Sequence, residues 1–296
     1  MIERINSISS YLKKEFGEKT VKLSIDGGFT CPNRDGSKGF GGCVFCSEAG
    51  SGDTASTIEE QKKLLSKKWP KAKYLAYFQN FTNTYAPVSI LREKFEAAIE
   101  DDSISGLVIG TRPDCLPEDV LDLLSELNEK TFLWVELGLQ TIHEDSAEFI
   151  NRCYPLEVYD SACRNLNKRN IRFVTHLILG LPGESKAQML DSVKYVCESG
   201  TWGIKLHLLN IIKGSQLAKT HPCYKPFETL DEYVNLVCDI LEYIPDDIII
   251  HRLTADAPRP ILISPPWSYR KRSILNGINQ EMRKRDSYQG CRYKQI

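Results

Sequence analysis

The sequence predicts an α/β protein built around a parallel sheet. Segments typical of strands and segments typical of helices alternate about six times along the chain, which is the pattern of βαβ units. Several strand-like segments are almost unbroken runs of Val, Ile and Leu, as expected of strands buried on both faces. The length of 296 residues suits one α/β barrel domain. A parallel barrel and a doubly wound sheet are both compatible with these observations.

Strands are predicted wherever a short apolar run is bounded by polar or turn residues. The predicted strands span residues 20–25, 74–79, 106–110, 133–139, 172–179, 204–209 and 247–253. In a parallel barrel, functional groups gather at the carboxyl ends of the strands. The residues that follow each run are therefore the candidates for a site.

Helices are predicted between the strands from amphipathic spacing and from capping residues. The predicted helices span residues 61–69, 118–127, 156–170, 185–199 and 233–241. Ser56 and Glu59 have the spacing of a capping box ahead of the first of these. Pro117 is expected at the first helical position of the second. Thr229 and Glu232 repeat the capping-box spacing ahead of the last.

The composition is that of an ordinary globular protein. Lys and Arg number 38 and Asp and Glu 39, a net charge of -1, with 42% hydrophobic and 26% charged residues. These values argue against a polybasic protein and against wholesale disorder. No apolar run approaches the length of a membrane span, and the N-terminal segment lacks the apolar stretch of a signal peptide. We therefore expect a cytoplasmic protein with no membrane partner.

Three cysteines follow the first predicted strand. Cys31, Cys43 and Cys46 have the spacing C-x11-C-x2-C, and the loop between them is rich in glycine. In a cytoplasmic protein, such thiols are expected to be metal ligands or redox groups rather than disulfides. Three thiolates can hold three irons of a [4Fe–4S] cluster and leave the fourth iron open. By spacing and position alone, zinc is equally compatible if Cys115 or Cys291 supplies a fourth ligand, and a thioredoxin-type pair would leave Cys31 unexplained.

Several motifs in order resemble one family. The segments CPNRDG, GGCVFC, GTRPDC, ELGLQ and HLILGLPGE are similar to those of the radical S-adenosylmethionine (SAM) superfamily. The long first cysteine gap resembles the branch related to the elongator catalytic subunit, and within it the bacterial group typified by YhcC and YtqA. The resemblance spans at least Lys22 to Ala257. It implies a partial (β/α)6 TIM-type barrel over residues 20–260, a short N-terminal extension over 1–19 and a basic C-terminal extension over 261–296 that packs on the core.

The resemblance also implies the cofactors and their ligands. Cys31, Cys43 and Cys46 would be the catalytic metal ligands of a [4Fe–4S] cluster. An electron from a donor such as flavodoxin or ferredoxin would cleave SAM to methionine and a 5′-deoxyadenosyl radical. Around SAM, the expected contacts are of four kinds: to the amino group, to the ribose, to the carboxylate and to the adenine. The implied cofactor-binding residues are Thr82, Asn83, Thr84, Glu136, Gln140, Arg152, His176, Leu209 and Ile211.

Two of these assignments depend on spacing seen in relatives. Gln140 at a strand end would hold the ribose, and Arg152, twelve residues later, the carboxylate by charge-assisted bonding. His176 stands where other branches carry an Asp that faces the ribose, although a lone strand His is more often a satisfied core residue. The chain departs from the family pattern at Gly110, where relatives tend to have Glu. It departs again at Cys153-Tyr154, where many have Gly-His.

Substrate contacts are predicted more loosely. The candidates are polar or basic residues at strand ends and in the tail: Arg112, His207, Lys213, Arg252, Arg270, Lys271 and Arg272. Two basic regions, residues 61–73 and the tail from Tyr269, interleave Lys and Arg with aromatic residues, a composition that suits RNA. Basic helices are also commonly just solvated faces. Arg112 is equally expected to pair with Asp114.

The resemblance favours tRNA as the substrate. Elongator-type relatives modify C5 of the wobble uridine, and the bacterial group is linked to the step that turns a 5-carboxymethylaminomethyl group into 5-aminomethyl. The leading hypothesis is thus a radical SAM enzyme in tRNA wobble uridine modification. The alternatives are a radical SAM enzyme that acts on a metabolite or a protein, and a non-enzymatic zinc-bound RNA-binding module.

Overall fold

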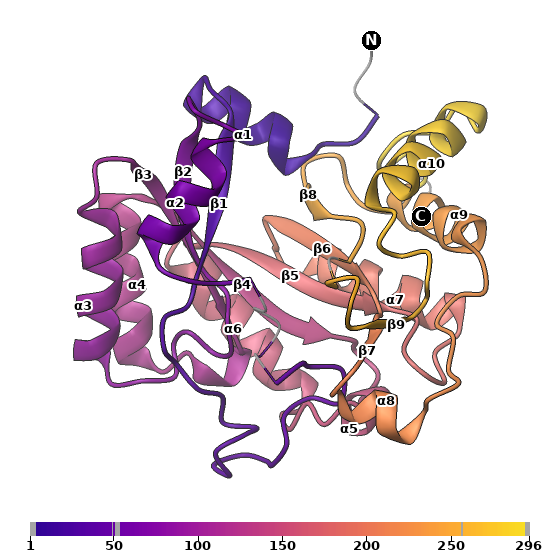
Figure 1. Ribbon diagram of the computed structural model, residues 1–296, viewed down its shortest axis with the longest axis horizontal. Helices are drawn as coiled ribbons and strands as arrows, with labels where there is room; N and C mark the ends of the chain where they lie inside the picture. Colours follow the sequence, from indigo (N-terminus) through magenta and orange to yellow (C-terminus); the bar gives the residue numbers. More distant parts are fainter. Residues whose placement is uncertain (1–3, 49, 51–53, 256, 294–296) are drawn as a thin grey trace.

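Seven parallel strands form one curled, half-barrel sheet. The computed structural model describes residues 4–48, 50, 54–255 and 257–293. The strand order is β1-β2-β3-β4-β5-β6-β8, and every neighbouring pair is parallel, which confirms the predicted parallel half-barrel (Figure 1). The strands are β1 (Thr20–Ile25), β2 (Lys73–Phe78), β3 (Ile104–Thr111), β4 (Phe132–Gln140), β5 (Arg172–Leu179), β6 (Gly203–Leu208) and β8 (Ile249–Arg252).

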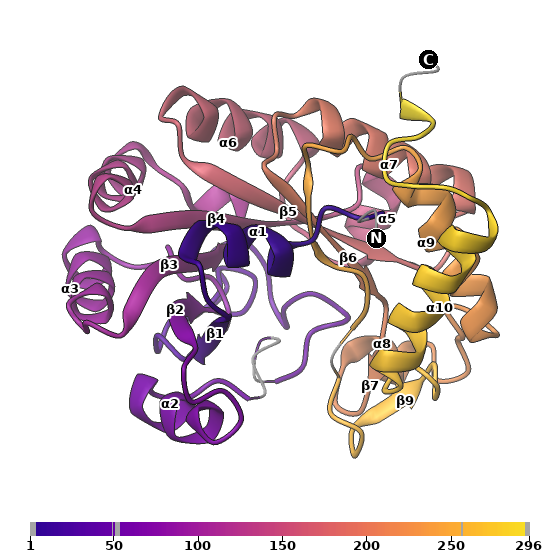
Figure 2. The same ribbon diagram turned by 90° about the horizontal axis from the view of Figure 1, so that it is seen from above.

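Helices cover the convex face of the sheet, as Figure 2 shows. In chain order the helices are α1 (Ile8–Phe16), α2 (Ile58–Ser66), α3 (Val88–Ile99), the 3-10 turn η1 (Pro113–Cys115), α4 (Glu118–Lys130), α5 (Glu144–Phe149), α6 (Leu156–Lys168), α7 (Lys186–Glu198), α8 (Gln216–Thr220), α9 (Leu230–Leu241) and α10 (Lys271–Lys284). Within the described part of the chain, none is both long and apolar enough to cross a membrane.

The two faces of the sheet contact different parts of the molecule, because successive side chains along a strand point to opposite faces. On β4, the outward Leu133, Val135 and Leu137 belong to the main core under the helices. The inward Trp134 belongs to a separate apolar cluster, and Glu136, two residues further along the same face, lines a cavity. The apolar character predicted for both faces therefore holds at the amino end of the strands and gives way to polar groups toward the carboxyl end.

Helix α1 closes the amino end of the half-barrel. Its buried Leu12 packs with Leu75, Val108 and Trp134 from three strands of the inner face. Backbone pairing joins Ser7, just ahead of the helix, to Ile250 of β8. The N-terminal segment thus fills the end of the barrel that is remote from the carboxyl ends of the strands.

The helix caps differ from the sequence predictions in three places. The capping box of α2 is formed by Thr57 and Glu60, so the prediction of Ser56 and Glu59 was one residue too early. Ser56 instead exchanges backbone hydrogen bonds with the β1 segment. Pro117 is the N-cap of α4 rather than its first residue. Thr229 caps α9 as predicted, but the Glu232 carboxylate accepts from the Glu228 amide and not from that of Thr229.

Elements that the sequence analysis missed shape the C-terminal part. A short antiparallel ribbon joins β7 (Ile211–Ile212) to β9 (Leu262–Ser264). The basic tail contains α10, which packs against α9. Its buried residues Ile274, Ile278 and Met282 recur every fourth residue, a helical spacing that the many basic residues around it obscured.

We predict that Leu91→Ala in α3 lowers the free energy of unfolding by about 2–5 kcal/mol, because it removes a fully buried side chain and leaves a cavity. The neighbouring Ile90 is 41% exposed, so Ile90→Ala is the matched control and should change stability by less than about 1 kcal/mol. Chemical denaturation of both variants measures the difference. Equal losses would mean that α3 does not pack on the sheet in this way.

Candidate functional site

One cavity of about 540 Å³ lies at the carboxyl ends of the strands. The cysteine loop forms one side, and the ends of β2, β3, β4, β5 and β6 form the rest together with the segment after β8. This is the place where a parallel half-barrel gathers functional groups. Its lining from the sheet includes Tyr77, Gln79, Thr111, Arg112, Glu136, Gln140, His176, Lys205, His207 and Arg252.

The three predicted cysteines meet at this cavity. Cys31, Cys43 and Cys46 are half-buried free thiols, and all three line it. The backbone amide of Cys46 donates to the Cys43 carbonyl at 3.0 Å, which places both residues in one turn. Burial and the neighbouring Cys46 raise the pKa of the Cys43 thiol. Bound metal would reverse that effect, because metal ligation requires the thiolate.

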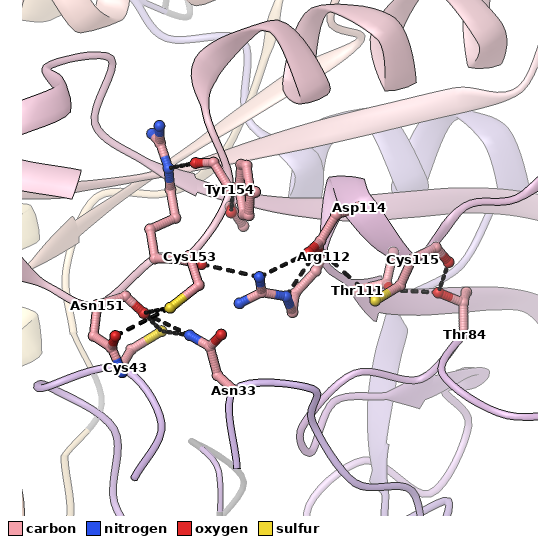
Figure 3. Close-up of polar contacts among 12 residues, drawn as sticks. Asn33, Cys43, Thr84, Thr111, Arg112, Asp114, Cys115, Asn151, Cys153 and Tyr154 are labelled. Carbon is pink, nitrogen blue, oxygen red and sulfur yellow. Dashed lines mark hydrogen bonds and ion pairs between the residues drawn. The ribbon is translucent and has the colours of Figure 1, made fainter. Parts of the chain in front are cut away.

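The loop that carries the cysteines is held by the turn after α5. The side-chain amide of Asn33 donates to the Asn151 carbonyl at 2.5 Å, and the amide of Asn151 donates back to the Gly42 carbonyl at 2.9 Å. Figure 3 shows Asn33, Cys43 and Cys153 gathered around the Asn151 carbonyl. Two segments more than a hundred residues apart thereby set the position of Cys43. Neither asparagine was identified from the sequence, because no local pattern marks their pairing.

The two residues named as fourth zinc ligands lie away from the three cysteines. Among the described residues, no three His, Cys, Asp or Glu side chains converge closely enough to ligate one metal ion. A [4Fe–4S] cluster spaces its cysteines more widely, since each thiolate binds a different iron. The proposed fourth zinc ligands are elsewhere: Cys115 is buried beside Asp114 and Cys291 lies near Ser287. Neither lines the cavity, so neither of these two residues is placed to be a fourth zinc ligand.

In the polar segment after β2, one predicted residue lines the cavity and two bind neighbouring strand ends. Thr82 lines the cavity, and its buried hydroxyl has no described partner, so it is available to a bound molecule. The Asn83 amide donates to the carbonyls of Phe78 and Gly110. The Thr84 hydroxyl meets Thr111 and the Cys115 carbonyl. Asn83 and Thr84 therefore hold the strand ends together and are outside the cavity lining, although the buried Asn83 Oδ1 also has no described partner. Their contacts with SAM stay predictions.

Gln140 and Arg152, paired in the sequence analysis, separate in the structure. Gln140 ends β4 in a left-handed conformation with φ 69°, next to a register shift, and lines the cavity. Arg152 is 1% exposed, and its guanidinium donates to the carbonyls of Tyr154 and Thr141 and to the Glu144 carboxylate. All three guanidinium nitrogens of Arg152 therefore already donate to groups of the protein. The contact of Arg152 with the carboxylate of SAM stays a prediction, and we do not include it in the proposed site.

Arg112 lines this side of the cavity, as does Arg34 of the cysteine loop. The Arg112 guanidinium forms a bidentate pair with Asp114, at 2.9 Å for both bonds, and donates to the Arg152 carbonyl (Figure 3). Burial opposes the charge, but the Asp114 carboxylate raises the pKa of Arg112. The pairing with Asp114 was anticipated as the alternative to a substrate contact, and it leaves a fixed positive charge beside the cysteine loop.

A buried carboxylate organises the floor of the cavity. Glu136 is 1% exposed. It accepts hydrogen bonds from the Tyr77 hydroxyl at 2.5 Å, from His176 Nε2 at 3.0 Å and from the Trp134 indole at 3.1 Å. It also forms ion pairs with Lys205 and, at 3.4 Å, with Lys22. The prediction that a strand Glu must be hydrogen-bonded when buried is confirmed, whereas its predicted role as a cofactor contact rests only on its place in the lining.

The charges of the floor shift each other's titration. Burial alone would raise the pKa of Glu136, yet Lys205, Lys22 and the His176 hydrogen bond hold it well below its ordinary value. Burial together with the Lys205 charge lowers the pKa of His176 to about 4. Burial likewise lowers the pKa of Lys205. The His176 imidazole is therefore neutral at neutral pH, and it donates to a carboxylate that the surrounding donors stabilise in its charged form.

The remaining predicted residues separate by position. His207, Leu209 and Arg252 line the cavity, and the buried Nε2 of His207 has no described partner. Ile211 is fully buried in a small apolar cluster and outside the cavity lining, and its contact with adenine stays a prediction. Its neighbour Ile212 lines the cavity instead. Lys213, Arg270, Lys271 and Arg272 are exposed and outside the lining.

Together these features define an α/β half-barrel protein with an open thiolate site facing a cavity at the carboxyl ends of its strands. The chain belongs to the radical SAM superfamily: that family matches residues 31–196, and the radical SAM C-terminal domain matches residues 201–284. The protein is thus a radical SAM enzyme, and its cofactors are a [4Fe–4S] cluster and SAM. The three thiols that line one cavity, and the partnerless Thr82 hydroxyl beside them, fit that pair of ligands.

Relatives of known sequence match over nearly the whole chain. The Bacillus subtilis protein YtqA is 46% identical, covering 99% of this chain and 94% of its own. The Escherichia coli protein YhcC is 40% identical, covering 89% and 87%. Among solved structures, the archaeal Methanocaldococcus infernus Elp3 has a TM-score of 0.68 at 16% identity and covers 91% of this chain and 64% of its own, which shows a shared fold.

We predict that Cys31→Ala, Cys43→Ala and Cys46→Ala each abolish the cluster. Each thiolate would bind a different iron, and this loop has no spare cysteine to replace a lost one. The measurement is iron and sulfide content with the visible spectrum after anaerobic reconstitution. Cys223→Ala, at an exposed cysteine outside the cavity, is the control and should retain the cluster. A Cys43→Ala protein with full iron content would remove that residue from the ligand set.

Gln140→Ala is expected to weaken SAM binding about 3–10-fold while sparing the cluster, as loss of one hydrogen bond does. Arg152→Ala is expected to lower the free energy of unfolding by about 2–4 kcal/mol instead, because it leaves buried carbonyls unpaired. Equilibrium dialysis with SAM and denaturant unfolding, applied to both variants, separate the two effects. Weakened SAM binding in a fully stable Arg152→Ala protein would restore the contact first expected for Arg152.

Proposed function

We propose that this radical SAM enzyme acts on tRNA, at the step that converts the 5-carboxymethylaminomethyl group of a wobble uridine into 5-aminomethyl. The observation that carries the proposal is the cavity floor. The Lys205 ammonium has three donors, of which Glu136 and Tyr77 accept two, and the buried Nε2 of His207 has no described partner. A carboxymethylaminomethyl group ends in a carboxylate, which is the acceptor that such a floor would bind.

Similarity to elongator proteins supports an RNA substrate. Elongator complex protein 3 of Schizosaccharomyces pombe is 28% identical over 166 residues, which is 54% of this chain and 29% of the relative. The fold of the archaeal Elp3 also extends over most of this chain. The resemblance implies chemistry at C5 of a wobble uridine, where a substituent on an unactivated carbon makes a radical route chemically reasonable.

In this proposal the residues of the cavity divide the work. The cluster and SAM, when bound, would supply a 5′-deoxyadenosyl radical that takes a hydrogen atom from the carboxymethyl methylene. One electron would then return to the cluster, water would enter, and the two-carbon piece would leave as glyoxylate, with the amine remaining on the tRNA. Cys31, Cys43 and Cys46 would hold the cluster at one side of the cavity. Lys205 and His207 would bind the substrate carboxylate at the floor. The half-buried walls between them exclude bulk water from a radical that must react only with the bound group.

The electron must come from outside the chain. We propose a cytoplasmic donor of the flavodoxin or ferredoxin type, which would approach the cysteine loop because that loop is where the cluster would sit. The side chain of Phe40 within this loop is 80% exposed, and exposed aromatic residues are common at interfaces.

The test is an anaerobic assay with reconstituted enzyme, SAM, dithionite and bulk tRNA from cells that lack the gene. We expect tRNA to increase the release of 5′-deoxyadenosine, and one uridine nucleoside to shift in mass after digestion. The Cys43→Ala protein is the negative control for both readouts. SAM cleavage with unchanged nucleosides would reject tRNA and leave a metabolite or protein substrate.

His207→Gln tests the floor separately. It should lower the rate on tRNA about tenfold or more if the imidazole binds the carboxylate, and leave iron content unchanged, because a charge-assisted hydrogen bond contributes about 1.5–3 kcal/mol. An unchanged rate would reject the floor as the carboxylate site.

A further inference from the structure

A stack of two arginines and a tyrosine lies on the surface beside the cavity. The guanidinium carbon of Arg259 is 4.7 Å from the centre of the Tyr269 ring, and that of Arg270 is 5.7 Å from it. Arg270 Nε also donates to the Tyr269 hydroxyl at 3.3 Å. Tyr269 is 40% exposed, and both arginines are exposed. The stack therefore presents two planar cations and an aromatic edge to solvent.

Backbone contacts fix the stack at the mouth of the cavity. Pro258, immediately before Arg259, lines the cavity. The ribbon of β7 and β9 ties this segment to Ile212, which also lines the cavity, and the Lys213 amide donates to the Ile261 carbonyl. Figure 2 shows that ribbon at the edge of the half-barrel facing α2 across the open side. Lys213 and the stack thus belong to one edge of the opening.

Four basic side chains at this edge form no ion pair with the described residues. Among the described residues, none forms an ion pair with Lys213, Arg259, Arg270 or Arg272. Further along the same tail, Arg285 pairs with Asp239 and Glu281, and Arg292 pairs with Glu242. The described part of the tail therefore contains arginines that pair with carboxylates and, nearer the cavity, arginines that form no ion pair.

The other basic region, residues 61–73, ends at the amino end of the sheet. Residues 61–73 end where β2 begins, and the Lys73 amide donates to the Lys19 carbonyl just ahead of β1. In a parallel sheet these are the amino ends of the strands, whereas the cavity is at the carboxyl ends. The lysines at the end of this region, Lys67, Lys68 and Lys71, therefore lie toward the amino ends of the strands and away from the cavity.

We propose that Lys213, Arg259, Tyr269, Arg270 and Arg272, called the rim here, bind single-stranded RNA next to the nucleotide that enters the cavity. The proposal rests on the proposed function and names the surface that would hold its substrate. Phosphates favour arginine and lysine that have no competing acid. Unpaired bases stack on tyrosine rings and on guanidinium planes. A loop with splayed bases can deliver one base to the cavity while its neighbours occupy the rim.

The test compares two triple variants that each remove three positive charges. One is Arg259→Gln, Arg270→Gln, Arg272→Gln at the rim. The other is Lys67→Gln, Lys68→Gln, Lys71→Gln on the opposite edge. Fluorescence anisotropy with bulk tRNA and cluster-loaded protein, from 50 to 200 mM salt, gives affinity and salt dependence. The rim variant should bind about tenfold or more weakly, with a salt slope shallower by about two, whereas the lysine variant should stay within about twofold of wild type.

Tyr269 separates stacking from charge. Tyr269→Phe should retain affinity, and Tyr269→Leu should lose about fivefold or more with an unchanged salt slope, because stacking on a ring releases no counterions. Iron content equal to wild type checks the fold of each variant. A rim variant that binds like wild type, or a lysine variant that loses as much, would overturn the rim alone. Wild-type protein that does not bind tRNA would overturn the proposed function and the rim together.

Discussion

The inner face of the half-barrel depends on one buried carboxylate. Glu136 on β4 draws together Tyr77 of β2, His176 of β5, Lys205 of β6 and Lys22 of β1. A carboxylate can be buried at modest cost only when donors and cations surround it. Each of these strands therefore has to place its polar residue at the same depth. Loss of the Glu136 charge would leave Lys205 buried without its partner, a situation that typically costs about 3–5 kcal/mol.

The same carboxylate decides what the cavity can bind. The Glu136 oxygens already accept from Tyr77, Trp134 and His176 and pair with Lys205, so this carboxylate has little capacity left to bind a further donor in the cavity. The opposite side is set by a different constraint. There Asn33 and Asn151 tie the cysteine loop to the turn after α5. The positive φ of Asn151 and of Cys153 turns the backbone so that one carbonyl faces both thiols. Floor and loop together leave a cavity with thiols at one side and donors at the base.

Much of this arrangement could be predicted because it depends on local patterns. Strand positions follow from apolar runs, and the three cysteines stand out by spacing next to the first strand end. The failures share a cause. Thr84 follows β2 and Arg152 lies in the turn after α5, and in such irregular segments a bulge or turn decides which way a side chain points. The register shift at Gly138 and Gln140 is such a feature. Lys205 was overlooked in an apolar strand, although an isolated charge there was a signal.

The sequence by itself determined the fold class, the family and the three thiols, because each rests on residues close together or on a repeating period. Only the tertiary structure decided which polar side chains face the cavity and which hold the scaffold. It also divided the basic residues into those paired within the fold, those at the amino end of the sheet and those beside the opening. The physical reason is that ion pairs and side-chain direction depend on neighbours from distant parts of the chain. A cluster of lysines reads the same in the sequence whether it lies at the amino or at the carboxyl end of the sheet, but only the carboxyl end borders the cavity.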